Sequence, residues 1–221
     1  MLYKNASPII VIDGPAGAGK STAAREVARR MCLPFLDTGA IYRAITLIMT
    51  RDRIPAIDSS ELRERLRGFC VSFSDRRVLV GGEDVTEAIR SPEIDSAVSP
   101  YSALPAVRES LLEIQRSQAS RGLVAEGRDM GTVVFPNADV KIFLTASPEV
   151  RATRRYLERA SRGETVSYDD ILAMVNQRDE IDSQRAVAPL KPAEDAVIFD
   201  TTCCDFEQVV NRILDECLRK R

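Results

Sequence analysis

The chain has 221 residues, of which 44% are hydrophobic and 29% charged, and its formal net charge at pH 7 is −2. This length is enough for one sizeable core without disulfides or metals, and the near-neutral charge argues against general binding to nucleic acid. The sequence contains no histidine, which excludes Ser-His-Asp and Cys-His catalysis and His-ligated metal sites. The reactions that remain are those that positioning and charge can carry.

The first predicted element is a buried strand at residues 8–13, which leads into the segment Gly-Pro-Ala-Gly-Ala-Gly-Lys-Ser at 14–21. This segment fits the phosphate-loop pattern, in which successive backbone N–H groups surround an anion and the following helix adds its N-terminal dipole. We expect Lys20 to reach the β- and γ-phosphates of a nucleoside triphosphate and Ser21 to bind Mg²⁺. A glycine-rich turn with a solvated lysine is the plainer alternative, but the flanking strand and the predicted helix at 21–30 favour the phosphate site. The residues predicted to bind the nucleoside triphosphate are Gly14, Pro15, Ala16, Gly17, Ala18, Gly19, Lys20, Ser21 and Thr22.

A second strand is predicted at residues 33–37, and a helix from Thr38 to about residue 49. Thr38 is interpreted as the N-cap of this helix or as a ligand contact, because the C-terminal end of a strand faces the usual ligand crevice of an open α/β sheet. The two roles are compatible.

From residue 54 the alternation of strands and helices is interrupted by an insert that is expected to end near Ser99 and Pro100. The elements expected in it are a short helix capped at 58–61, antiparallel strands at 69–74 and 77–80 around a turn at 74–76, and a Gly-Gly turn at 81–82. The pattern predicts a small antiparallel sheet outside the main one.

The second half of the chain returns to short apolar strands and helices. The elements expected are a helix at about 104–120, strands at 123–126 and 139–144, a helix from Pro148 capped by Ser147, a helix from about 168 toward 182 opened by a Ser167–Asp170 capping box, a strand at 196–200, and a final helix capped by Asp205 with Gln208. Five strands that alternate with helices predict a parallel, doubly wound sheet.

One stripe of the helix near 168–182 changes from apolar to charged along its length. Its members are Ile171, Val175, Arg178, Asp182 and Arg185. If the apolar half packs on the body, the charged half faces inward, where unpaired charge is costly and a charged ligand would be favoured. The apolar segment 186–190 is expected to be buried, which supports that interpretation; an Arg-Asp-Arg network at a surface is the alternative.

Charged residues also follow the strand at 123–126. Glu126 and Asp129 lie where ligands bind in such sheets, so a carboxylate there could hold Mg²⁺ through water, and Arg128 could neutralise a phosphate. Five arginines between 151 and 162 are interpreted either as the solvated face of a helix or as part of a mobile lid over a triphosphate.

The chain resembles the bacterial cytidylate kinases, within the nucleoside monophosphate kinase family, over essentially its full length. The segments that carry the resemblance are Ile-Asp-Gly-Pro-Ala-Gly-Ala-Gly-Lys at 12–20, Leu-Asp-Thr-Gly-Ala-Ile-Tyr-Arg at 36–43, Gly-Arg-Asp-Met-Gly-Thr-Val-Val-Phe-Pro at 127–136, Lys-Ile-Phe-Leu-Thr-Ala at 141–146 and Gln-Arg-Ala-Val-Ala-Pro-Leu at 184–190. Thr38 stands where the family often has Ser, and Glu126 where it often has Asp; both keep the functional group.

The resemblance implies an α/β fold in a single kinase unit, with a five-stranded parallel sheet flanked by helices. It implies a phosphate-loop NTPase core at 1–53, 103–150 and 183–221, an antiparallel β-containing insert at about 54–102 that binds the nucleoside monophosphate, and a short helical lid at about 151–167 with the following helix at 168–182. By similarity Thr38, Ser99, Arg108, Asp129 and Arg185 surround the cytosine, Arg178 and Asp182 lie at the sugar, and Arg43 and Arg128 hold the acceptor phosphate.

The reaction implied is transfer of the γ-phosphate from ATP to CMP or dCMP with Mg²⁺, for which Lys20, Arg128 and Arg178 are the expected catalytic residues. An acceptor phosphate needs no general base, which agrees with the absence of histidine. The second possibility is a phosphate-loop kinase for another small acceptor, such as a different nucleotide or a hydroxy acid. A hydroxyl acceptor would need a base, for which Asp13, Asp37, Glu126 and Asp129 are the candidates. A nucleotide-dependent switch or RNA-binding regulator is the third possibility, and the near-neutral charge counts against it.

The five cysteines show no metal-ligand spacing, and we interpret them as reduced thiols of a cytoplasmic protein. Neither a signal peptide nor a membrane-spanning run is evident. ATP and CMP or dCMP are the expected partners, with no nucleic acid and no membrane, and the protein is expected to be a monomer.

Overall fold

Short apolar segments rich in Ile, Val and Leu form the central strands, because side chains on both faces of a parallel sheet can be buried under helices. A computed structural model describes residues 7–74 and 77–220. The chain divides into two compact units, Met1–Leu36 with Gln118–Arg221 and Asp37–Ser117. The predicted insert at 54–102 lies within the second of these units.

The sheet of the first unit has five strands in the order β2-β6-β1-β7-β8, which confirms the predicted doubly wound α/β fold. β1 runs parallel to β6 and β7, and β7 runs parallel to β8. The strands are β2 (Phe35–Asp37), β6 (Leu123–Gly127), β1 (Ile9–Asp13), β7 (Val140–Thr145) and β8 (Val197–Asp200). The phosphate-loop pattern therefore begins at the C-terminal end of the middle strand.

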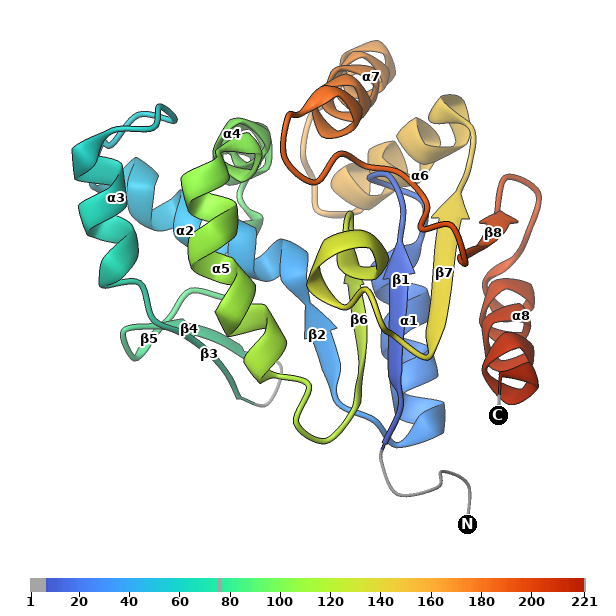
Figure 1. Ribbon diagram of the computed structural model, residues 1–221. Helices are drawn as coiled ribbons and strands as arrows, with labels where there is room; N and C mark the ends of the chain where they lie inside the picture. The colour runs from blue at the N-terminus through green and yellow to red at the C-terminus, as the bar shows by residue number, and fades with distance from the viewer. Residues whose placement is uncertain (1–6, 75–76, 221) are drawn as a thin grey trace. The chain divides into compact units, whose positions relative to one another are not determined.

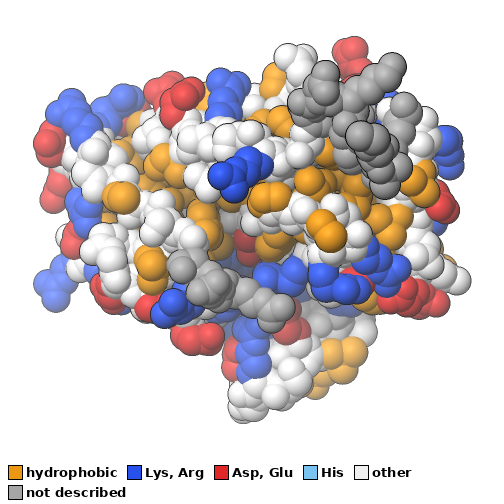
Figure 2. Space-filling model, turned by 90° about the horizontal axis from the view of Figure 1, so that it is seen from below, with side chains coloured by type: hydrophobic (Ala, Val, Ile, Leu, Met, Phe, Trp, Pro, Cys, Tyr) orange, Lys and Arg blue, Asp and Glu red, His pale blue; other side chains and the backbone are white. Residues whose placement is uncertain are grey.

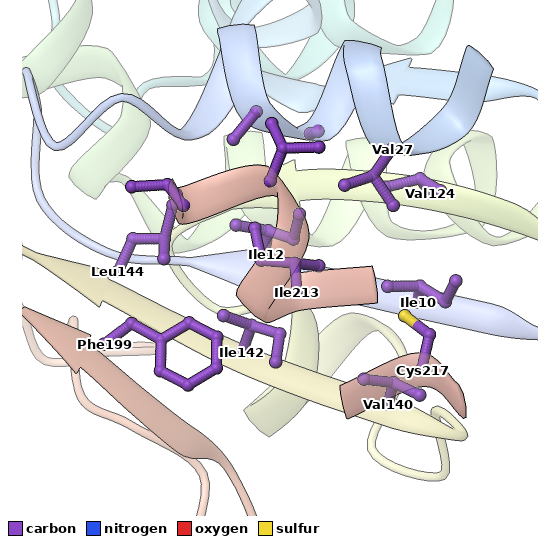
Figure 3. Packing of buried hydrophobic residues seen from close by; sticks show 14 of the residues in the cluster. Ile10, Ile12, Val27, Val124, Val140, Ile142, Leu144, Phe199, Ile213 and Cys217 are labelled. Atoms are coloured by element: carbon purple, nitrogen blue, oxygen red, sulfur yellow. The ribbon is translucent and has the colours of Figure 1, made fainter. Parts of the chain in front are cut away.

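Helices α1 (Lys20–Met31) and α8 (Phe206–Arg219) pack against one face of this sheet. Ile10 and Ile12 of β1 point into that core, in which Val27 of α1 and Ile213 of α8 are also buried (Figure 3). The single π-helical turn among the described residues, η2 (Met130–Val134), lies on the other face (Figure 1), and the sequence did not predict it. Alternation of side chains along β1 thus separates a packed face from the face that carries η2.

Helices α6 (Pro148–Ser161) and α7 (Tyr168–Gln184) pack on each other through a small apolar cluster of Ala152, Ile171 and Val175. Ser147 caps α6 as predicted, since its hydroxyl accepts a hydrogen bond from Val150 N at 3.3 Å. The capping box expected at Ser167 and Asp170 was wrong, because the Ser167 side chain accepts no capping bond. Asp at this position has a shorter side chain than the Glu or Gln of the usual box.

The second unit contains four helices, a short 3₁₀ turn and a small antiparallel sheet among its described residues. Their bounds are α2 (Thr38–Arg51), α3 (Ser60–Arg67), β3 (Val71–Ser74), β4 (Arg77–Val80), β5 (Glu83–Asp84), η1 (Ala88–Arg90), α4 (Pro92–Ala103) and α5 (Pro105–Ser117). The sheet order β3-β4-β5 confirms the predicted antiparallel insert. The turn expected at 74–76 includes Asp75 and Arg76, which lie outside the described residues.

Two local predictions in this unit were wrong. The N-cap of α2 is Asp37 and not Thr38, because the Asp37 carboxylate accepts the bond from Ala40 N at 2.9 Å. Ser99 and Pro100 do not end a segment but lie inside α4. Pro100 has no N–H to donate to the carbonyl of Ser96, yet the chain continues helical to Ala103, and Pro105 begins α5.

Acidic and basic side chains are interspersed on the face of the molecule shown in Figure 2. This mixture agrees with the formal net charge of −2. None of the described helices has both the length and the apolar composition required to cross a bilayer.

Candidate active site

The phosphate-loop segment connects β1 to α1 in a conformation that requires glycine at its first position. Gly14 has φ +143°, and a Cβ added there would lie 1.9 Å from the carbonyl oxygen of Leu144 on β7. A larger residue would therefore force β1 and β7 apart, since the contact is with backbone. The loop begins in close contact with the neighbouring strand.

Lys20, in the first turn of α1, is only 5% exposed, and its Nζ donates to the carbonyl oxygen of Pro15 at 2.8 Å. Burial lowers the pKa of Lys20 to about 7; the positive charges of Arg128 and Arg178 act in the same direction, and Glu126 opposes them. The charged form of this lysine is costly here and would be stabilised by a polyphosphate.

Asp13, the last residue of β1, holds the start of η2. Its Oδ1 accepts from Met130 N at 2.9 Å and its Oδ2 from Gly131 N at 2.8 Å. Burial raises the pKa of Asp13 to about 6, although these two hydrogen bonds lower it. Asp13 therefore fixes the backbone that immediately follows Arg128 and Asp129.

Four of the predicted substrate-binding residues form one charged network in the first unit. Arg128 Nε lies 2.9 Å from Asp182 Oδ2, and Arg185 Nη1 lies 3.6 Å from Asp182 Oδ1. Arg185 Nη2 also lies 3.9 Å from Asp129 Oδ1. The structure therefore brings together residues from the loop after β6 and from the C-terminal end of α7.

The network keeps Arg128 and Asp182 charged. Burial acts against the charged form of Arg128, but the Asp182 carboxylate outweighs it and holds the pKa of Arg128 above its ordinary value. For Asp182, burial acts to raise the pKa, yet the positive charges of Arg128 and Arg178 bring it below the usual range. Arg178, half-buried on α7, thus acts electrostatically on Asp182 and on Lys20.

One side of α7 changes from buried apolar residues to buried charged residues along the helix, as predicted. Ile171 and Val175 are buried in the cluster with α6, while Asp182 and Arg185 are buried in the charged network. The expectation that residues 186–190 are buried was wrong, since Val187 is 37% exposed. The backbone turns here through Ala188 at φ +51°, and its carbonyl accepts from Arg185 Nε at 2.6 Å, so a main-chain group faces the network.

Of the other five predicted substrate-binding residues, Arg178 lies on α7 and four belong to the second unit. Thr38 on α2 and Ser99 on α4 are buried. Arg43 on α2 lies 2.7 Å from Asp95 of α4, a partner that the sequence did not suggest. This ion pair connects α2 to α4 within the unit.

Arg108 on α5 is the last of these four residues. Its Nη1 donates to the carbonyl oxygen of Ser102 at 3.0 Å, and its guanidinium lies 5.3 Å from the centre of the Tyr42 ring. Arg108 thus links α5 to both α4 and α2.

Two arginines of α6 contact the phosphate-loop segment, and the sequence did not predict this role for them. Arg151, 3% exposed, donates from Nη1 to Ala16 O at 3.1 Å, and Arg154 Nη1 lies 3.5 Å from Gly17 O. Their spacing of three residues places them on one side of a helix, which a reader of the sequence could have noted. The pattern does not indicate which element that side contacts.

Comparison with known proteins gives consistent results. A family model described as cytidylate kinase matches residues 10–219. A cytidylate kinase of Carboxydothermus hydrogenoformans is 44% identical over 216 residues, which cover 96% of this chain and 97% of the relative. A cytidylate kinase of Pseudomonas aeruginosa is 45% identical over 222 residues, with 97% of each chain covered. An uncharacterized protein from Eubacterium ventriosum, solved by crystallography, shares the fold with a TM-score of 0.51 at 13% identity, over 97% of this chain and 100% of that one.

Proposed function

Because the chain belongs to the cytidylate kinase family, we propose that it transfers the γ-phosphate of ATP to CMP or dCMP, giving ADP and CDP or dCDP. The observation that supports this most directly is the position of Lys20, which is buried in the phosphate-loop segment that follows the middle strand. Burial lowers its pKa, and the nearby positive charges of Arg128 and Arg178 lower it further. A cationic cluster beside a phosphate-loop segment suits two phosphate groups that exchange a phosphoryl group between them.

In this reaction a phosphate oxygen of the acceptor attacks the γ-phosphorus in line, and the bond from that phosphorus to the β–γ bridging oxygen breaks. The acceptor phosphate is already a nucleophile near neutral pH, so the protein has to position it and to neutralise charge. We assign Lys20 to the β- and γ-phosphates, Arg128 to the acceptor phosphate, and Arg178 to the charge that develops during transfer. Exclusion of water then prevents hydrolysis of ATP.

The donor chemistry of the loop fits Mg²⁺. The metal prefers oxygen ligands and keeps several waters and phosphate oxygens. The exposed Ser21 hydroxyl would be a protein ligand, and the Glu126 carboxylate could bind through water. Among the described residues, no three acidic or cysteine side chains form a metal site, so most ligands would come from the nucleotide and from water. The ion supplies charge neutralisation on the phosphates.

For the acceptor we propose roles by family resemblance. We assign cytosine recognition to Thr38, Ser99, Arg108, Asp129 and Arg185, the sugar to Arg178 and Asp182, and the acceptor phosphate to Arg43 and Arg128. The segments at about 54–102 and 151–167 are assigned to nucleoside monophosphate binding and to a lid. Arg151 and Arg154 stand at the start of the second segment and contact the loop, so we expect the movement beyond them, toward residue 167. Slower amide exchange at 151–167 with a bisubstrate analogue would support the lid, and unchanged exchange would contradict it.

A hydroxyl acceptor fits the geometry less well, because such a reaction needs an available base. Both oxygens of Asp13 accept backbone N–H groups, Asp37 caps α2, and Asp129 lies near Arg185. Glu126, the fourth candidate, acts electrostatically on Lys20 and Arg128, whose pKa values its negative charge raises. The site therefore supports a phosphate acceptor better than a hydroxy acid.

A coupled assay with ATP and a panel of acceptors tests the function. The panel contains CMP, dCMP, UMP, AMP and GMP, with shikimate as a hydroxy acid. We expect the highest kcat/KM with CMP or dCMP and slow ATP hydrolysis without an acceptor. Phosphorylation of shikimate alone would contradict the proposal. ATP hydrolysis that no acceptor accelerates would favour the alternative of a nucleotide-dependent switch.

We also propose that the enzyme acts as a monomer in the cytoplasm. None of the five cysteines, which all lie within the described residues, is in a disulfide, as expected for a reducing compartment. Sedimentation at micromolar concentration tests the oligomeric state.

A further inference from the structure

Three successive carbonyl groups of the phosphate-loop segment face side chains from other elements of the first unit. Arg151 Nη1 donates to Ala16 O at 3.1 Å, and Arg154 Nη1 lies 3.5 Å from Gly17 O. The Thr201 hydroxyl lies 3.3 Å from Ala18 O and 3.0 Å from Thr145 O, so its one proton serves either acceptor. The contact at Ala16 is the shortest of the three.

The orientation of a carbonyl determines the orientation of the next N–H group. The peptide bonds of the described chain are trans, and in a planar trans peptide the C=O and N–H groups point in opposite directions. Because Ala16 O points toward Arg151, the Gly17 N–H points away from it. The same holds for the N–H groups of Ala18 and Gly19, whose preceding carbonyls face Arg154 and Thr201.

Arg151 is itself held from three sides. Its Nε donates to Ala146 O at 2.9 Å, and its Nη1 lies 3.0 Å from Asp179 Oδ1, with a second contact from Nη2 to Asp179 Oδ2. Its Cβ lies 3.0 Å from where a Cβ of Gly17 would be, so only glycine leaves room for this approach. A planar guanidinium with several donors can serve Ala146, Ala16 and Asp179 together, which an ammonium group cannot do.

We infer that Arg151 is a positioning residue for the phosphate loop: it holds the Ala16–Gly17 peptide so that the Gly17 N–H is aimed at the phosphates before they bind. This inference rests on the proposed use of the loop for ATP. Asp179 neutralises the charge of Arg151 and connects it to α7, next to Arg178 in the chain. The guanidinium acts on the backbone of the loop, and not as a direct phosphate ligand.

The test is binding of inorganic tripolyphosphate, which reports on the loop without base or sugar. Calorimetry with Arg151→Met should show about 10- to 100-fold weaker binding of tripolyphosphate and ATP, the effect of losing one hydrogen bond to a charged group. The dissociation constant for CMP, measured in the same way, should change less than about threefold. Arg29→Met is the matched control, because Arg29 is exposed and contacts Glu26 of its own helix α1; it should bind both ligands like the wild type.

Two milder variants keep the test decisive if Arg151→Met folds poorly. Arg151→Lys keeps the positive charge but replaces the planar guanidinium with an ammonium group. Asp179→Asn removes the negative charge that holds the guanidinium of Arg151. Both variants should weaken tripolyphosphate binding by about 3- to 10-fold. In each folded variant, the NMR signals of the Gly17 amide and the Ala16 carbonyl should shift, while those of Val124 stay in place.

Binding of tripolyphosphate within twofold of wild type in these variants would overturn the inference, and so would equal losses for tripolyphosphate and CMP. Failure of the wild type to phosphorylate any nucleotide would refute the proposed function alone, since the binding measurements do not depend on turnover.

Discussion

The phosphate-loop segment and the charged network of α7 hold their polar groups in different ways. In the loop, the carbonyls of Ala16 and Gly17 are held by Arg151 and Arg154, so that the N–H groups that follow them point away from these arginines. In the network, Arg128, Asp182 and Arg185 contact one another directly. The loop is preorganised by groups that need not move, whereas the network must rearrange its ion pairs if it is to contact a charged substrate.

This difference predicts different responses to mutation. Removing a cation from the loop takes away charge stabilisation that no neighbour replaces. When one member of the network is changed, the other members can form new ion pairs. A substitution in the network should therefore have a smaller effect, and it should lower both protein stability and substrate affinity.

The largest effect is expected for Lys20→Met. We expect kcat to fall at least about 10³-fold, because the charge on the β- and γ-phosphates loses its partner. Stability of the nucleotide-free protein should be unchanged or higher at pH 7, since burial makes the charged lysine costly. Initial rates and thermal unfolding measure the two effects.

The exposed Lys191→Met is the control for this variant and should behave like the wild type. A folded Lys20→Met variant with near-normal kcat would remove the phosphate-loop mechanism.

Asp129→Ala should narrow the preference for CMP over UMP. A carboxylate accepts from the amino group of cytosine but repels the O4 oxygen of uracil, and each mismatched polar group costs about 1–3 kcal/mol, or about tenfold to a few hundredfold in kcat/KM. The ratio of kcat/KM for the two nucleotides measures this effect. Equal losses on both bases would instead assign Asp129 to phosphate or Mg²⁺ positioning.

Asp182→Asn should lower stability by about 1–3 kcal/mol at pH 7 and raise KM for CMP, because Arg128 and Arg185 lose a charged partner. The pKa of Asp182 is held below its ordinary value in the folded protein, so its contribution exists above the unfolded pKa and disappears as pH falls through the folded one. The stability difference should therefore shrink below about pH 4.

Denaturant titration at several pH values measures that difference. The exposed Asp170→Asn on the same helix is the control. A difference that stays constant down to pH 3 would show that the charge of Asp182 is not responsible.

The smallest effect is a pH dependence of ATP binding. The pKa of Lys20 is lowered to about 7, and bound phosphates should raise it, so binding above pH 7 should take up a proton. The affinity should fall at most tenfold per pH unit as pH rises from 7 toward 9. Calorimetry in two buffers with different ionisation enthalpies measures the uptake, which should be absent in Lys20→Met; uptake that persists in this variant would assign it to another group.

Local chemistry was enough to predict much of this protein. The pattern at 14–21 predicted the loop between β1 and α1, the apolar runs predicted the five-stranded sheet, and the Asp205–Gln208 capping box predicted the start of α8. These features depend on neighbours in the sequence, where backbone sterics and periodicity decide the outcome.

Other features were decided by contacts between residues far apart in the chain. Nothing near Arg151 in the sequence shows that it contacts Ala16, 135 residues away, and nothing near Arg43 indicates Asp95. The same applies to Asp13 and the η2 backbone at Met130.

The α2 cap was also settled by geometry, since Asp37 and Thr38 are both good caps and only the backbone path places the Asp37 carboxylate at Ala40 N. Sequence determined which residues carry charge and where the chain turns. Tertiary structure decided which charges meet, because a side chain's partner depends on the packing of whole elements and not on its neighbours in the chain.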